Sequence, residues 1–112
     1  MKGKNMSGQP SGPPSSRGGE TNCASLIEET VLNSPNPKVV EKLRVGDVLE
    51  LHLQKTGKAV ALYAMRGAEA AGSITSSLLS KIIDCINDGF EYVAVVQKVS
   101  GGACRIQIRP KS

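Results

Sequence analysis

The sequence of 112 residues has no tryptophan, one histidine and only three aromatic side chains in all. A protein that holds single strands of nucleic acid mainly by stacking bases on rings needs more aromatic residues than this. No apolar run approaches the roughly 18 residues that a membrane-spanning helix requires, and no apolar stretch near Met1 is typical of a secretory signal. We therefore expect a cytoplasmic protein without a membrane partner.

Cysteine is also scarce, with Cys23, Cys85 and Cys104 far apart in the chain. An odd number of cysteines without a secretory signal argues against a disulfide framework, so we expect reduced thiols. We expect Cys85 and Cys104 to be small buried apolar side chains. Structural zinc sites pair their ligands at short spacing, and the sequence has no Cys-x-x-Cys or His-x-x-x-His. It therefore predicts neither a metal site nor a cofactor.

The residues that carry catalysis in other proteins are not arranged here in a catalytic pattern. His52 occupies an outward position of a predicted strand, which is typical of a solvated surface histidine. The one pair of adjacent carboxylates, Glu28-Glu29, alternates onto opposite faces of a strand and cannot share a site. The glycine pairs at 18–19 and 101–102 do not stand between a strand and a helix, as a phosphate-binding loop requires. We therefore predict that the protein is not an enzyme.

Charge and composition divide the chain into two parts. Residues 1–22 are dominated by glycine, serine and proline and carry three basic groups against one acidic group, so their net charge is +2. Such a segment cannot bury enough apolar surface to offset its conformational entropy, and we predict a disordered tail. Residues 23–112 carry 11 basic and 9 acidic groups, again +2, and their size and composition predict a single domain.

Within residues 23–112, short stretches with an apolar residue at every second position predict strands. These strands are predicted at 24–32, 48–54, 59–65, 91–100 and 103–109. A short helix is predicted at 37–43, and an amphipathic helix, capped by Thr75 or Ser76, at 76–87. Residues 66–71 are predicted to be a loop that leads into a short pairing segment at 72–74. This order predicts an α+β fold: a small, strongly bent antiparallel sheet, or a partly open OB-like barrel, with one lid helix.

The last predicted strand carries a row of polar side chains that indicates a binding surface. Arg105, Gln107 and Arg109 point to one face, Lys98 lies on the hairpin partner, and Cys104, Ile106 and Ile108 point to the other face. Side chains at every second position are about 6.5–7 Å apart, which is comparable to the phosphate spacing of an extended single strand. The alternative interpretation is a solvated outer face, or a row of charge that protects an edge strand from aggregation.

Two of the few aromatic residues complete the candidate nucleic-acid-binding set. Tyr63 and Tyr92 lie in predicted strands, and their rings are the candidate stacking surfaces for bases. The set as a whole is Lys98, Arg105, Gln107, Arg109, Tyr63 and Tyr92.

The order of segments between Leu43 and Arg109 resembles the HIRAN module of helicase-associated and stand-alone proteins. The resemblance is carried by GDVLELHL, AVALYAM and GSIT, by an amphipathic helix closed by INDGFEYVAVV, and by CRIQIR. It covers about two thirds of the chain. Members of that family form a small OB-like barrel and are associated with recognition of single-stranded DNA ends, so the resemblance implies DNA binding.

Two functions from different classes follow from these observations. The first is a non-enzymatic module that binds single-stranded nucleic acid through the basic strand face. The second is a protein-interaction or homodimerisation module, in which an open sheet edge or the helix face binds a partner or a second copy.

Overall fold

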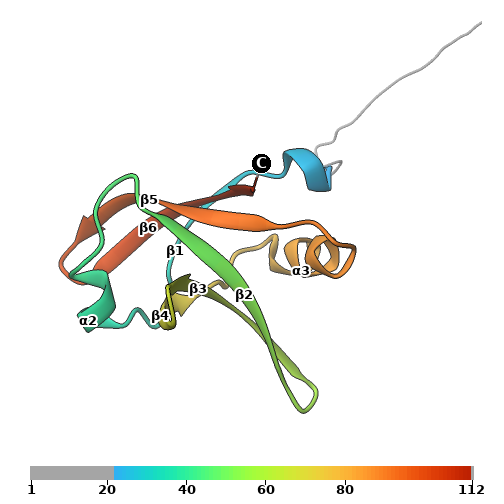
Figure 1. Ribbon diagram of the computed structural model, residues 1–112, viewed down its shortest axis with the longest axis horizontal. Coiled ribbons are helices and arrows are strands. Elements are labelled where there is room, and N and C mark those ends of the chain that lie inside the picture. Colours follow the sequence, from blue (N-terminus) through green and yellow to red (C-terminus); the bar gives the residue numbers. More distant parts are fainter. Residues whose placement is uncertain (1–21, 112) are drawn as a thin grey trace, which may run out of the picture.

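A computed structural model describes residues 22–111 of the chain. In this part of the chain the fold is α+β, with a six-stranded antiparallel sheet bent into a half-barrel and two α-helices (Figure 1). The predicted fold class is therefore confirmed. The strands are β1 (Glu28–Val31), β2 (Val48–Thr56), β3 (Ala59–Arg66), β4 (Glu69–Ser73), β5 (Tyr92–Ser100) and β6 (Ala103–Pro110), and their order in the sheet is β1-β6-β5-β2-β3-β4.

The predicted disordered tail, residues 1–22, lies outside the described residues apart from Asn22. Among the residues that the structure describes, no helix is long and apolar enough to cross a membrane.

Both predicted hairpins are present, and they form the centre of the sheet. β5 and β6 are joined by Gly101-Gly102, where both glycines have positive φ, 57° and 86°; this conformation is costly for residues with a Cβ. β2 and β3 pair from Glu50 to Thr56 and project as a ribbon away from the rest of the sheet (Figure 1). The two hairpins meet through β2 and β5, which pair only at Val48–Glu50.

The two edges of the sheet approach each other where β1 ends, which bends the sheet into the half-barrel. Asn33 continues β1 and exchanges backbone hydrogen bonds of 2.9 Å with Ser73 of β4. The approach depends on Gly72, because a Cβ there would lie 3.0 Å from Leu32 Cβ and 3.1 Å from the Asn33 carbonyl oxygen. The prediction of a loop at 66–71 is wrong in its second half, since β4 begins at Glu69.

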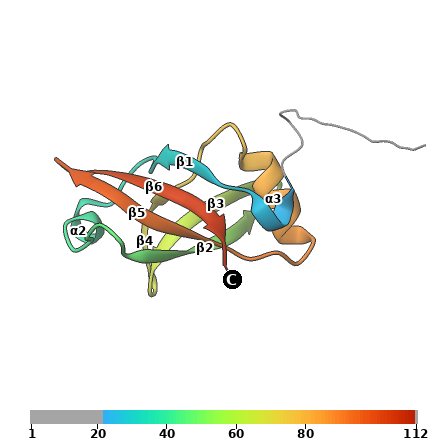
Figure 2. The same ribbon diagram turned by 90° about the horizontal axis from the view of Figure 1, so that it is seen from above.

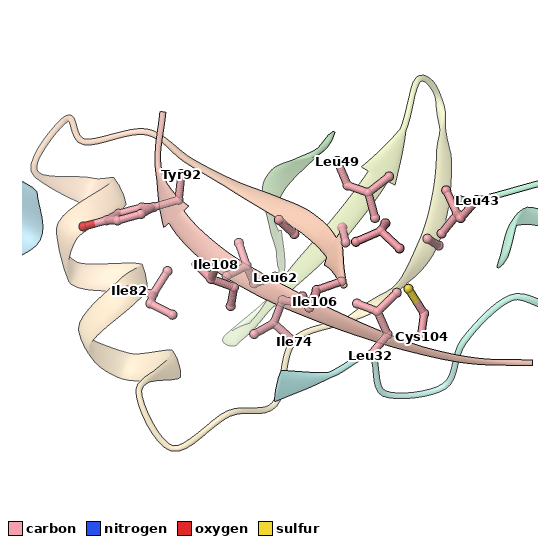
Figure 3. Packing of buried hydrophobic residues seen from close by; sticks show 14 of the residues in the cluster. Leu32, Leu43, Leu49, Leu62, Ile74, Ile82, Tyr92, Cys104, Ile106 and Ile108 are labelled. Carbon is pink, nitrogen blue, oxygen red and sulfur yellow. The ribbon is translucent and has the colours of Figure 1, made fainter. Parts of the chain in front are cut away.

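The concave side of the half-barrel holds one apolar cluster (Figure 3). Strands β2 to β6 contribute side chains to it, and Leu26 and Leu32 join it from either side of β1. Cys104, Ile106 and Ile108 of β6 are fully buried, as the alternation predicts. Leu43 and Leu32 lie toward one end of the cluster, and Ile82 and Tyr92 lie at the other, beside the longer helix (Figure 3). Burial raises the pKa of the Cys104 thiol.

The two α-helices are shorter than predicted. α2 (Pro37–Val40) begins after Asn36, whose side chain accepts a 3.1 Å hydrogen bond from the Lys38 amide. α3 (Leu79–Asn87) begins three residues later than predicted, and neither Thr75 nor Ser76 caps it through a side chain. The helices cover opposite ends of the half-barrel (Figure 2).

The N-terminal end of the fold differs most from the prediction. Residues 24–32 do not form one strand: a 3-10 helix, Cys23–Ser25, precedes β1. Cys23 forms a disulfide with Cys85 of α3, at a Cα–Cα distance of 5.6 Å, so the expectation of three reduced thiols is wrong. The disulfide and a hydrogen bond from the Tyr92 hydroxyl to the Cys23 carbonyl oxygen hold the 3-10 helix against α3 and β5.

Candidate nucleic-acid interface

The candidate interface is the outer face of β6, where side chains point away from the core. Arg105 and Arg109 are exposed and Gln107 is half-buried, because their neighbours in sequence occupy the core. The two arginines are four residues apart, so their Cα atoms are separated by about 13–14 Å along the strand. The strip therefore has one cation at each end and an amide between them.

A β-bulge in β5 adds Lys98 to this face. The register of β5 and β6 runs from Val96 opposite Ile106 to Lys98 opposite Arg105, which leaves Gln97 as an extra residue. Without the bulge, Lys98 would point into the core as Val96 does, because residues two apart in a regular strand face the same side. Bulges re-aim side chains in this way, and here the bulge places a lysine directly across from an arginine. We call Lys98, Arg105, Gln107 and Arg109 the basic strip.

The surface is hollowed at the Lys98 end of the basic strip. A depression of about 340 Å³ is lined by Val31, Lys98, Ser100, Ala103 and Arg105. It combines two cations and a hydroxyl group with two small apolar side chains. Such a set of donors suits a phosphate group, and the apolar wall suits the sugar attached to it.

The cations of the basic strip are available to a ligand. Among residues 22–111, no carboxylate oxygen lies within 4.0 Å of Lys98, Arg105 or Arg109. The nearest carboxylates in the sheet register are Glu29, opposite Gln107, and Glu50, two strands away from Arg109. Glu50 is itself paired with Lys111, at 3.3 Å.

The two tyrosines do not join the basic strip. Tyr92 is only 3% exposed, and its ring lies in the core beside α3 (Figure 3), so it offers no open ring face to a base. Tyr63 is half-buried on β3, opposite His52. β3 is three strands away from β6, which is about 14 Å across the sheet. The structure therefore brings together Lys98, Arg105, Gln107 and Arg109 and leaves both rings outside the group.

Sequence reasoning missed Val31, Ser100 and Ala103, which complete the depression. Ser100 and Ala103 flank the glycine turn and could have been found from the hairpin alone. Val31 could not, because it reaches Arg105 through the pairing of β1 with β6, which are more than 70 residues apart in sequence. In the described part of the chain, no group of three or more His, Cys, Asp or Glu side chains is placed to hold a metal ion.

Comparison of the chain with protein-family models, with curated proteins and with solved structures finds no match. The resemblance to the HIRAN module therefore stays a prediction from the pattern of segments.

Proposed function

We propose that the protein is a non-enzymatic module that binds the backbone of single-stranded nucleic acid along the basic strip. The observation that carries the proposal is the alignment of Lys98, Arg105 and Arg109 on one open sheet face. None of the three has a carboxylate partner among the described residues. Unpaired cations at an extended spacing are what a polyanion of similar spacing requires.

The side chains of the basic strip determine how selective and how salt-dependent the binding should be. Contacts to phosphate and sugar fix position and carry no sequence information, and Gln107 is the one uncharged polar group in the row. With no ring in the strip, stacking contributes little. We expect binding that differs little between base compositions and falls steeply with salt.

The experiment is a titration of fluorescein-labelled oligothymidylate and oligoadenylate, followed by fluorescence anisotropy at several salt concentrations. Three phosphate contacts to a single strand predict a slope of log K against log salt of about −2, and each lost contact lowers its magnitude by about 0.7. In the double variant Arg105→Ala, Arg109→Ala the magnitude of the slope is expected to fall below about 1.

Lys38→Ala is the matched control, because this lysine is exposed on α2 and stands outside the strip. It is expected to leave affinity and slope unchanged. Absence of binding at low salt, or an equal loss in the control and the arginine variants, would refute the proposal. A defined dimer in sedimentation together with no oligonucleotide binding would instead favour the homodimerisation alternative.

A further inference from the structure

A second surface lies where β2 and β5 separate. Their pairing ends at Glu50 opposite Val93, and β2 continues to Thr56 paired with β3 alone among the described residues. From Leu51 onward, the backbone of β2 therefore presents an unpaired edge toward β5. The two strands diverge here, with α3 at the opening between them (Figure 1). An unpaired strand edge is a template for an added strand.

The separation of the strands opens a hollow of about 230 Å³ whose lining is partly apolar and partly charged. Its apolar part is formed by Leu51, Ile86, Phe90 and Tyr92, which come from β2, α3, the loop after α3 and β5. Phe90, three residues after the end of α3, is 39% exposed. The hollow matches the size of one or two apolar side chains rather than of a larger ligand.

The rim of the hollow is acidic, and the chain's own lysine sits in it. Lys111 Nζ lies 3.3 Å from Glu50 Oε2 and 3.9 Å from Glu91 Oε1. The two glutamates are largely exposed and Lys111 is about half exposed, so each contact is weak and exchangeable. A cationic side chain of a partner could therefore take the place of the Lys111 ammonium between Glu50 and Glu91.

We propose that the split between β2 and β5 binds a basic, extended peptide segment of a partner protein. The peptide adds as a strand to the free edge of β2 and places an apolar side chain in the hollow. One of its lysine or arginine side chains displaces Lys111 from Glu50 and Glu91. This surface is separate from the basic strip. It binds a cationic ligand, whereas the basic strip binds an anionic one, so it would give the proposed nucleic-acid-binding module a protein partner as well.

The experiment measures fluorescence anisotropy of labelled peptides with the full chain at fixed salt. The probes are Arg-Val-Leu-Val-Arg, its glutamate counterpart Glu-Val-Leu-Val-Glu, and Arg-Val-Pro-Val-Arg. The proline peptide keeps both charges but lacks a central backbone donor. We expect the first peptide to bind at least about tenfold more tightly than either of the others.

Variants of the rim distinguish the proposal from non-specific attraction. Glu50→Gln and Glu91→Gln are each expected to weaken binding of the arginine peptide about fivefold. Lys111→Ser is expected to strengthen it about two- to fivefold, because it removes the internal competitor. Glu41→Gln, an exposed carboxylate beside α2, is the control and should change nothing. Thermal unfolding of each variant checks that it is folded.

Two results would overturn the proposal. Equal binding of the arginine and proline peptides would show that strand addition does not occur. Weaker binding after Lys111→Ser would show that the lysine supports the site rather than occupying it.

Discussion

The disulfide between Cys23 and Cys85 offers the sharpest test of the structure, because the sequence argued against it. Its two cysteines are 62 residues apart, so the bond closes most of the described chain into one loop. In the chain-entropy account of disulfides, a loop of that length stabilises the folded state by about 4 kcal/mol at 25 °C. That is a large part of the 5–15 kcal/mol typical of a whole domain.

The assay compares urea unfolding of the oxidised protein and of the protein reduced with dithiothreitol. We expect reduction to lower the free energy of unfolding by about 4 kcal/mol and to move the midpoint to lower urea. The slope should rise, because the reduced unfolded chain is less compact and exposes more surface. Hydrogen exchange should show the loss of protection first in the 3-10 helix and α3, which the bond joins.

Thiol counting provides the control. Because Cys104 is the one free cysteine, denatured protein should react with one equivalent of a thiol reagent before reduction and three equivalents after it. Cys104→Ala should leave the effect of dithiothreitol on the midpoint unchanged. Three reactive thiols in unreduced protein, or a urea midpoint unchanged by dithiothreitol, would contradict a stabilising disulfide between Cys23 and Cys85.

Three further substitutions test the packing, each by urea unfolding. Gly72→Ala should cost about 1–3 kcal/mol, because the added Cβ would lie 3.0 Å from a side chain of the segment that closes the half-barrel. Ile106→Ala should cost about 2–5 kcal/mol, whereas Ile27→Ala, at a site that is 57% exposed, should change stability by less than about 0.5 kcal/mol. Burial raises the pKa of the Tyr92 phenol above 10.0, so the folded protein keeps this proton where the unfolded chain releases it. The free energy of unfolding should therefore fall as the pH rises above about 10, the ordinary pKa of tyrosine, and Tyr92→Phe should reduce that fall.

Strands were predictable where local pattern alone determines them. The alternation in β6 correctly separated the buried side chains from the exposed ones, and the glycine pair correctly placed the β5–β6 turn. Only the end of β4 was predicted, as the pairing segment at 72–74, because Glu69–Ser73 is made mostly of small residues with little contrast between its faces. β4 is held in the sheet by its pairing with β3 and by the bridge between Ser73 and Asn33. Neither contact can be recognised from the sequence of residues 69–73 alone.

The candidate site was predictable only in part, for the same reason. Arg105, Gln107 and Arg109 follow from the period of one strand. The outward position of Lys98 depends on a bulge that breaks that period. The burial of Tyr92 depends on α3 and the 3-10 helix packing over it, and the pairing of Cys23 with Cys85 depends on the same long-range contact.

Glu50 links the two proposed surfaces, and one substitution there tests both. In the sheet register Glu50 lies opposite Val93, and Val93 lies opposite Arg109, so Glu50 is about 10 Å from the end of the basic strip. That distance is close to the screening length at physiological salt, so its charge acts weakly on a polyanion bound there. The same carboxylate contacts Lys111 at the rim of the hollow.

Glu50→Lys should therefore act in opposite directions on the two ligands. Oligonucleotide affinity should rise by a few fold at low salt, because the substitution extends the row of cations and removes a repulsive charge. Affinity for the arginine peptide should fall by at least about tenfold, since a cation replaces the partner carboxylate. Because Glu50 is exposed, we expect the variant to fold normally, so that changes in binding report on the two surfaces. A loss of both binding activities would contradict the separation of the surfaces. If oligonucleotide binding rises and peptide binding is unchanged, the result would support nucleic-acid binding along the basic strip. It would also show that the carboxylate of Glu50 does not take part in peptide binding.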